Sequence, residues 1–384
     1  MARRFTPKVP RPLELGRRLV DLLGPTGGAA RQTLVALCFN SSTSFVAGAV
    51  LGSILGTFDR LPGLLVMVPA AIGMRGNVFG SMGNRLSTAI HAGTFRSTFR
   101  KDSVLRQNVV ASMSLTVVLS LVLAVLAKIV AVGFGVPDSI SVLDLTLISV
   151  IGGLLASSIV LAATVVLAVL SVRRGWDMDN LVAPTTATLG DVITIPALFV
   201  ASHLVTGSAA TTVLGWLTVL VALTTLVVSL RTRQALVRQI FRESLPVMAA
   251  ALVLSTLAGL AVEKQLAIFA ALPALLVLEP AFVSSAGSLG GILSSRVATN
   301  LHLGLVEPTL RPGREVRRDA AAVALIGLPV FVFNGMGAHF VAKLLGERSP
   351  GLGWMLVVAL AAGLVAVAFV LAVAYYGTIA AWRG

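Results

Sequence analysis

The sequence contains few charged residues and a single cysteine. Only 12% of its 384 residues are charged, against about 25% in an average soluble protein, and 56% are hydrophobic. The lone Cys38 excludes an intrachain disulfide and any metal cluster built from several cysteines. Neither a zinc-protease motif nor a phosphate-binding loop occurs, and the apolar runs leave little length for a soluble catalytic module. We therefore expect no enzyme.

Acidic residues are fewer than basic ones, 16 against 30, which gives a formal net charge of +14. The basic residues lie in short segments between apolar runs and not on one continuous face, so the charge indicates no nucleic-acid partner. Runs such as 112–127 and 355–374 have the composition of membrane helices, which need about 20 apolar residues each. We expect the lipid bilayer to surround the chain.

Ten apolar stretches predict an all-α polytopic membrane protein. They lie at about 31–58, 62–91, 104–136, 142–172, 181–206, 209–230, 245–262, 266–302, 318–344 and 352–381. Most arginines lie in the basic tail 1–30 and in the loops 92–108, 173–180, 231–243 and 303–319. Because basic loops stay in the cytoplasm, we predict a multi-pass protein of the plasma (inner) membrane with both termini of this chain cytoplasmic.

Two segments of the sequence repeat each other. Residues 64–93 and 275–304 align without a gap, and eleven of the thirty positions are identical. The identities include Pro69 with Pro280 and Arg85 with Arg296. The difference in residue number between aligned positions is constant, and we call this difference the repeat offset. Shared hydrophobicity does not by itself preserve proline and arginine, so we interpret the similarity as an internal duplication.

The duplication divides the chain into a basic tail (1–30), a first repeat (31–206), a linker helix with a basic loop (207–244) and a second repeat (245–384). Five spans would invert a second copy, and the extra span at 209–230 restores its direction, so we expect two parallel repeats. The second repeat has four spans; either the sequence continues past Gly384 or this half lacks its fifth helix. A monomeric pseudo-dimer and a homodimer both remain open.

Only two acidic residues, Asp191 and Glu279, lie well inside apolar stretches, where an unpaired charge is costly. Thr185, Thr188 and Asp191 are spaced by three and share one face of the expected helix, which would present oxygens to a pore. Mg²⁺ prefers oxygen ligands and keeps most of its waters. Alternatively, Asp191 is a neutral or internally hydrogen-bonded acid that holds two helices together. Glu279 fits a pore role and a packing role equally.

Further polar and helix-breaking residues surround these acids. Asp177, Asp179 and Asn180 lie at the cytoplasmic entrance of the span that carries Asp191. Proline and glycine in the second span either expose backbone carbonyls or allow a neighbouring helix to approach closely. The candidate pore-lining or pore-shaping residues are Pro69, Gly73, Gly76, Asn77, Pro184, Thr185, Glu279 and Pro280.

Two of these patterns resemble signatures of MgtE-type magnesium channels. The run from Pro69 through Gly73, Gly76 and Asn77 to Gly93 is similar to the second-helix signature of that family. The run Asp177-x-Asp179-Asn180-x3-Pro184-x3-Thr188-x-Gly190-Asp191 is similar to the fifth-helix signature. Its opening also resembles the eukaryotic solute-carrier relatives of MgtE, which carry two such domains in one chain.

The resemblance implies that Asp191 helps to bind hydrated Mg²⁺ in a central pore between the two repeats, with Mg²⁺ as the transported ion. The candidate metal-contacting residues are then Asp191, Thr188, Asp177, Asp179 and Asn180. Several positions depart from the family pattern: Arg75 replaces a glycine, Ser288 stands in the second repeat where the first has Asn77, and the second repeat lacks the aspartate motif. The family's soluble sensor domains are also missing from the sequence.

We therefore expect a divalent cation transporter or channel with inward flux driven by the membrane potential. One alternative is an exchanger that couples the divalent cation to Na⁺ or H⁺. A second is a non-transporting membrane subunit or assembly factor, which the replaced asparagine and the missing second aspartate favour.

Overall fold

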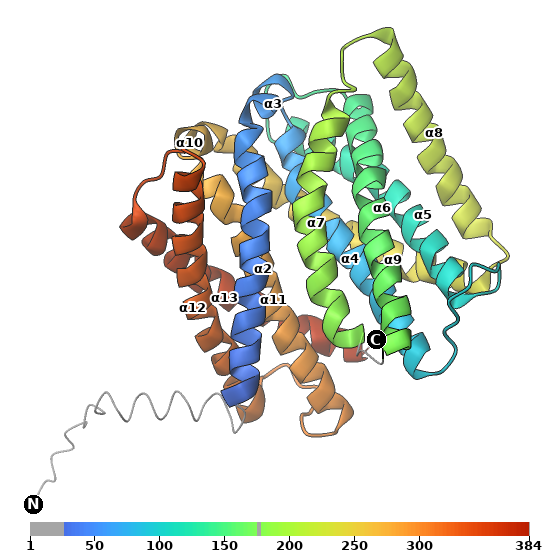
Figure 1. Cartoon of the computed structure of the whole chain (residues 1–384), viewed down its shortest axis with the longest axis vertical. Helices are drawn as coiled ribbons and strands as arrows, with labels where there is room; N and C mark the ends of the chain where they lie inside the picture. The colour runs from blue at the N-terminus through green and yellow to red at the C-terminus, as the bar shows by residue number, and fades with distance from the viewer. Residues whose placement is uncertain (1–26, 175–177, 384) are drawn as a thin grey trace, which may run out of the picture. The chain divides into compact units, whose positions relative to one another are not determined.

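The computed structural model describes residues 27–174 and 178–383, and within these ranges all regular structure is helical. The helices are α2 (Gly27–Ser53), α3 (Leu55–Arg60), α4 (Leu64–His91), α5 (Val104–Gly133), α6 (Val142–Arg174), α7 (Met178–Ser202), α8 (Ala209–Arg231), α9 (Ala235–Lys264), α10 (Leu266–Ala271), α11 (Ala274–His302), α12 (Arg314–Leu344) and α13 (Leu352–Arg383), shown in Figure 1. This confirms the all-α expectation. Helices suit a bilayer because they satisfy their backbone polar groups internally.

Ten helices of the described chain are long and apolar enough to cross a membrane, as the sequence predicts. The other two, α3 and α10, have six residues each and are too short to span. Each of them precedes a longer helix, α4 or α11, that contains a proline. The chain is therefore a multi-pass membrane protein.

Helix α9 begins at Ala235, so the predicted loop 231–243 is wrong in its extent and only 232–234 separates α8 from α9. Val237, Ile240 and Phe241 are buried and share one face of the helix, which joins the apolar core. Their spacing of three and four residues continues the helix through a segment whose other face carries exposed arginines. The predicted loop 303–319 is also wrong in its extent, because α12 begins inside it at Arg314.

The chain forms two compact units whose boundaries fall inside helices. The larger unit comprises Ser42–Ala281 and Ala338–Pro350, and the smaller unit comprises the described residues of Met1–Ser41, Phe282–Gly337 and Gly351–Gly384. These units group residues by contact and do not follow the order of the predicted repeats. The predicted repeat boundaries therefore stay a prediction.

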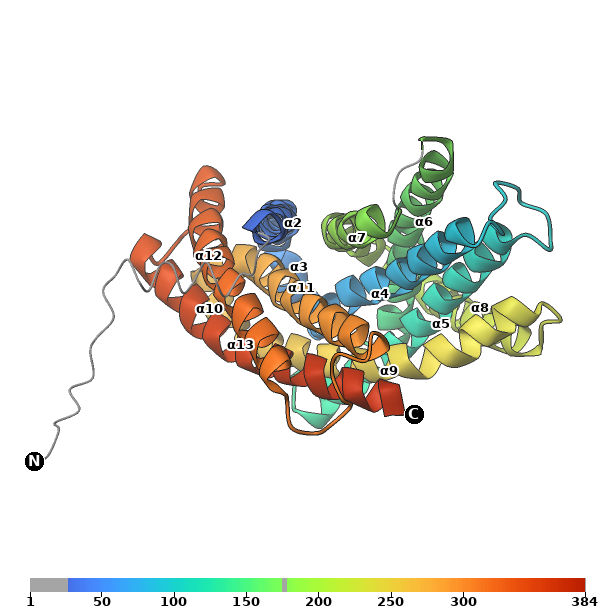
Figure 2. The same ribbon diagram turned by 90° about the horizontal axis from the view of Figure 1, so that it is seen from below.

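In the larger unit, α4 is the central helix. It packs against α5, α6, α7 and α9, and Figure 2 shows α9 running along α4 and α5. Leu64, Leu65, Val66, Met67 and Val68 are all buried, which a helix achieves only when neighbours surround it. By contrast, α8 contacts mainly α5 and α6. Only 22% of the residues in its most apolar stretch are buried, against 61% of those in α4. The exposed apolar side of α8 therefore suits contact with lipid.

The smaller unit has its own apolar core around Phe331 of α12. The Phe331 and Phe282 rings lie 5.1 Å apart between centroids, and Gly363 of α13 leaves the space that the Phe331 ring occupies. Gly335 allows a similar approach to the backbone of α13, because a Cβ there would lie 2.9 Å from the carbonyl oxygen of Met355. Small residues at helix contacts are the usual means of close packing in membranes.

The helix pattern recurs along the chain at the repeat offset seen in the sequence. Both ends of α3 map onto the ends of α10 at that offset, and the bounds of α4, α5 and α6 map closely onto those of α11, α12 and α13. A polar pair recurs in the same way: Arg85 donates to Asn108 over 2.7 Å, and Arg296 lies 3.4 Å from Asp319. Such recurrence is expected if the chain arose by duplication.

Two close helix contacts in the larger unit are also related by the repeat offset. Gly48 of α2 lies against Val277 of α11, where an added Cβ would be 2.5 Å from the Val277 carbonyl oxygen. Gly259 of α9 lies against Val66 of α4 in the same way, because an added Cβ there would overlap the Val66 carbonyl oxygen. The first helix of each predicted repeat thus packs against the second helix of the other repeat. This exchange ties α2 to α11 and α9 to α4.

We predict that Gly48→Ala and Gly259→Ala each lower the free energy of unfolding by about 1–3 kcal/mol, because the added methyl group displaces backbone. Denaturation of the purified chain in mixed detergent micelles measures the change. Gly377→Ala in α13 is the control: a Cβ there meets no described atom within 4 Å, and alanine favours a helix over glycine by about 1 kcal/mol. Equal stability of all three variants would contradict the assigned contacts.

Candidate functional site

Asp191 lies in α7 and is 7% exposed, so its carboxylate is buried in the larger unit. The hydroxyl of Ser44 in α2 donates a hydrogen bond to Asp191 Oδ2 over 2.7 Å. A buried carboxylate needs such donors because burial removes its hydration. The sequence placed Asp191 inside a span, and the structure adds a donor that supports it there.

A second polar contact lies beside the first on the same two helices. Thr43 Oγ1 donates to Thr188 Oγ1 over 3.3 Å. Thr43 and Ser44 are consecutive in α2, whereas Thr188 and Asp191 are three residues apart in α7, as the predicted face requires. We call these four residues the α2–α7 polar seam. It places three hydroxyl groups and one carboxylate along a single helix contact.

A second carboxylate belongs to the same part of the larger unit. Glu279 of α11 is half-buried and interacts electrostatically with Asp191. Pro280 follows it inside α11, at the position that Pro69 has in α4. The structure therefore brings together the only two acids that the sequence placed well inside apolar stretches.

The glycines of α4 divide into two groups. Gly83 packs directly against Val182 of α7, and a Cβ on Gly80 would lie 3.8 Å from Thr186 Oγ1, so these two positions serve helix packing. At Gly73 and Gly76 a Cβ would meet no described atom within 4 Å, and Asn77 beside them is exposed. These three residues leave an open face of α4, and Pro69 lies one turn before them.

Some predicted site residues lie outside the described structure. Asp177 is one of them, and of Asp179, Asn180 and Pro184 only the helical backbone of α7 is described. Thr185 is half-buried in α7. The inner entrance of the span therefore remains a sequence prediction.

Arg75 is an unexpected feature of α4. Its side chain is fully buried, and Nη1 donates to the carbonyl of Ala71 one turn earlier. Nη2 would lie 3.4 Å from a Cβ on Gly153, so the guanidinium group points toward α6. Because Asn77 is exposed while Arg75 is buried, the charge of Arg75 belongs to the helix packing and not to the open face of α4.

Sequence reasoning missed Thr43 and Ser44. They end the run Asn40-Ser41-Ser42-Thr43-Ser44, which interrupts the first apolar stretch. Five consecutive side chains with hydrogen-bonding groups inside a span are unusual, and this run was the signal that could have identified α2 as a partner of α7.

The seam and Glu279 offer oxygen atoms only. Among the described residues no three His, Cys, Asp or Glu side chains form a group that could hold a metal ion. Two carboxylates among hydroxyl groups suit a hard divalent cation that keeps most of its waters, as Mg²⁺ does, better than a dehydrated ion. Oxygen atoms of this kind are the ligands that Mg²⁺ and its water shell use in proteins.

Ten candidate spans define a polytopic membrane protein, and its helices α7 and α11 carry two carboxylates that interact electrostatically. Residues 68–201 and 279–383 match the family model of MgtE, which is described as a divalent cation transporter. The chain therefore belongs to the MgtE family of divalent cation transporters. Asp191 falls within the first matched segment and Glu279 begins the second.

Curated relatives agree with this family. The chain is 26% identical to "Solute carrier family 41 member 2" of Homo sapiens over 290 residues, which is 72% of this chain and 49% of the relative. It is 27% identical to the Xenopus laevis member 2 over 71% of this chain and 50% of that protein. It is 26% identical to "Solute carrier family 41 member 3" of Rattus norvegicus over 71% and 60% of the two chains.

The chain thus spans about half the length of the member 2 relatives that it matches. No solved structure matches the chain.

We predict that Ser44→Ala lowers the free energy of unfolding by about 1.5–3 kcal/mol, because the Asp191 carboxylate loses a hydroxyl donor. Ser158→Ala is the matched control: the Ser158 hydroxyl donates to the carbonyl of Leu154 in its own helix, and its removal should change stability by less than about 0.5 kcal/mol. Denaturation of both variants in mixed micelles tests this. Equal stability would mean that the Ser44 bond contributes nothing.

Proposed function

We propose that the chain is a divalent cation transporter or channel that moves Mg²⁺ across the plasma membrane. The observation that carries this proposal is the buried Asp191 carboxylate, held by Ser44 and within electrostatic reach of Glu279. Carboxylates inside a membrane are rare and costly, and they typically mark ion pathways. The family match supports divalent cations as the cargo.

In this proposal Asp191 attracts the hydrated ion and Thr188 offers a hydroxyl oxygen to its water shell. The Ser44 hydrogen bond to Oδ2 orients the carboxylate toward the ion. Glu279 supplies the second negative charge, so a divalent cation neutralises the pair. Hydrogen bonds to coordinated waters suffice, because Mg²⁺ sheds its waters reluctantly.

The remaining predicted residues take supporting roles. Asp177, Asp179 and Asn180 form an inner vestibule that concentrates cations. The open face of α4 at Gly73, Gly76 and Asn77 lines or shapes the pore. Pro69, Pro280, Pro184 and Thr185 shape the helices around it.

We also propose that the two predicted repeats share a common origin and that both termini of this chain are cytoplasmic. The recurrence of helix bounds at the repeat offset and the paired contacts of Gly48 and Gly259 support the duplication. The arginine-rich segments support the orientation, because basic loops are retained in the cytoplasm.

We predict that Asp191→Ala lowers Mg²⁺ flux into reconstituted vesicles at least about tenfold, as expected when a partner of a bound metal ion is removed. Flux is followed with a Mg²⁺-sensitive dye inside the vesicles under an imposed membrane potential. Glu279→Gln should lower the flux less, because the Asp191 carboxylate that attracts the ion in this proposal remains.

Asp144→Asn serves as the matched control for the loss of a carboxylate. Asp144 is half-buried at the start of α6, where the hydroxyl of Ser141 donates to it over 2.7 Å. The Mg²⁺ flux of the Asp144→Asn variant should equal that of the unmodified chain. Unchanged flux in Asp191→Ala would refute the proposed site, and flux lost equally in all variants would indicate a general defect.

A coupled exchanger is the second candidate, favoured by the proximity of Asp191 and Glu279. Two neighbouring carboxylates repel each other when both are charged, and either a cation or a proton relieves this repulsion. We predict that, for a channel, flux depends on the Mg²⁺ gradient and membrane potential alone. Flux that requires an opposing Na⁺ or H⁺ gradient in the same vesicles would establish the exchanger instead.

A further inference from the structure

Two turns of the larger unit lie at the same end of its helices. One joins α4 to α5 through residues 92–103, and the other joins α8 to α9 through residues 232–234. Arg85, near the end of α4, donates to Asn108 near the start of α5 and interacts electrostatically with Glu243 near the start of α9. Figure 2 shows both turns on the right-hand side of the view, where these helix ends meet.

Exposed basic side chains gather at this end of the larger unit. We call them the basic rim, and they are Arg96, Arg100, Lys101, Arg231, Arg233, Arg238 and Arg242. Within the same two segments, 92–103 and 231–243, the acidic residues are Asp102 and Glu243. The rim therefore has a positive charge that its own segments do not balance.

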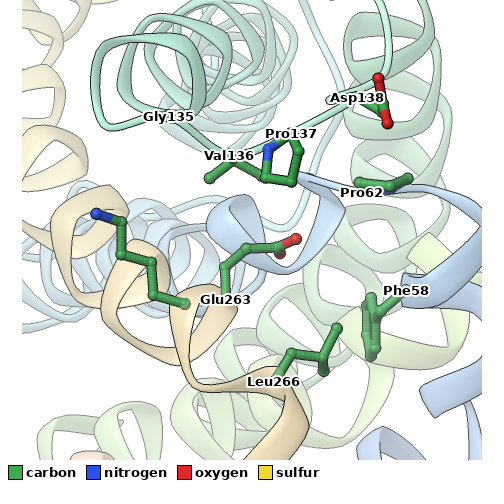
Figure 3. A pocket seen from close by; sticks show the side chains of 9 residues that line it. Phe58, Pro62, Gly135, Val136, Pro137, Asp138, Glu263 and Leu266 are labelled. Carbon is green, nitrogen blue, oxygen red and sulfur yellow. The ribbon is translucent and has the colours of Figure 1, made fainter.

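The opposite end of the larger unit carries charges of both signs. Glu263 at the end of α9 and Asp138 in the loop after α5 line a cavity there, and Lys264 belongs to the same wall (Figure 3). Glu263 Oε1 accepts a hydrogen bond from the backbone N–H of Gly63 over 2.8 Å, so this acid stabilises the start of α4. An excess of basic side chains is thus a property of the rim and not of every helix end.

The equivalent turn of the second predicted repeat has a different charge. At the repeat offset, Glu307 stands where the α4–α5 turn has Arg96, and Pro312 stands where it has Lys101. Because α11 and α12 are connected without these two basic residues, the turn itself does not require them. Their presence in the rim calls for a separate explanation.

Exposed apolar side chains lead along the helices to the rim. On α8, Leu223, Val227 and Arg231 are exposed and share one face, because they are spaced by four residues. On α9, Arg242 and Val253 are exposed and share one face in the same way. A surface that is apolar along the helices and basic at their ends fits a ligand with apolar chains and an anionic head.

Phe99 lies among the basic residues of the α4–α5 turn. Its side chain is 61% exposed, and Arg100 and Lys101 follow it directly. Exposed aromatic side chains beside basic ones are typical of segments that lie at the boundary between lipid headgroups and acyl chains. The turn connects two candidate spans, which places it close to that boundary.

We propose that the basic rim binds the headgroup of an anionic phospholipid whose acyl chains lie along the exposed apolar faces of α8 and α9. Arg231, Arg233 and Arg238 at the α8–α9 turn contact the phosphate. Phe99 enters the bilayer beside the headgroup. Clusters of about four to eight basic residues next to a membrane span are typical binding surfaces for such lipids. The sequence predicts both turns to be cytoplasmic, the side on which anionic lipids give the leaflet a negative surface potential.

The test is lipid binding to the purified full chain in a neutral detergent, followed by native mass spectrometry. Phosphatidylglycerol and phosphatidylcholine with identical acyl chains are the probes, so that the two lipids differ only in the headgroup. We expect phosphatidylglycerol to bind at least about tenfold more tightly, because each basic residue near an anionic headgroup strengthens binding about fivefold. Equal binding of the two lipids would overturn the proposal.

Arg233→Gln combined with Arg238→Gln should weaken phosphatidylglycerol binding about tenfold or more and leave phosphatidylcholine binding unchanged. Both side chains are exposed, so the substitutions leave the apolar core intact. If this double variant keeps the full preference for phosphatidylglycerol, the rim is not the binding surface.

Arg311→Gln combined with Arg314→Gln is the matched control. Both arginines are exposed at the turn between α11 and α12, where Glu307 and Glu315 offset their charge. The same loss of charge there should change phosphatidylglycerol binding less than about twofold. An equal loss in both double variants would mean that the total charge of the chain governs binding, which contradicts a site at the rim.

Excess glycerol 3-phosphate distinguishes a lipid from a free phosphate. It carries the anionic group without acyl chains, so it should not displace bound phosphatidylglycerol. Displacement would assign the rim to a soluble phosphate ligand and overturn the lipid assignment. Because binding is measured without transport, the result is independent of the flux test at Asp191.

Discussion

A carboxylate buried among membrane helices must be solvated by the protein, and this requirement sets the arrangement of the larger unit. Asp191 is buried, so α2 has to present a hydroxyl group to α7 at the depth of that carboxylate. Ser44 does so, and Thr43 beside it contacts Thr188. The polar run in α2 would be unfavourable in an apolar span without such partners. The hydrogen bond from Ser44 to Asp191 therefore fixes one point of contact between α2 and α7.

Close backbone contacts supply the second constraint. Gly48 and Gly259 each bring a helix against the backbone of a valine, and the repeat offset relates the two glycines and the two valines. In a bilayer, lipid tails are as apolar as leucine, so helices associate through close packing more than through hydrophobic burial. Both glycines therefore allow the close approach on which this packing depends. Through these contacts Glu279, two residues after Val277, is held in a helix that packs on α2.

The helices recur at the repeat offset, but equivalent positions carry different side chains. Arg85 pairs with a neutral amide of Asn108, and Arg296 pairs with the carboxylate of Asp319 at the equivalent positions. The helix bounds recur at the repeat offset, whereas the charges at these equivalent positions differ. Glu263 and Asp138 follow the same pattern, since Gly52 and Ser349 stand at the equivalent positions. An asymmetric molecule can thus carry sites that a symmetric dimer would have twice.

Sequence periodicity by itself determined the all-helical class, the ten spans, the repeat offset and the two intramembrane acids, because each depends on residues close in sequence or on direct similarity. The longer α9 was missed, since an amphipathic extension has little net hydrophobicity and is apolar only on the side that meets the core. Only the tertiary structure decided that Ser44 supports Asp191, that Glu279 lies near it and that Glu263 faces a cavity. Such contacts join residues 147 and 200 positions apart, whose meeting depends on helix packing.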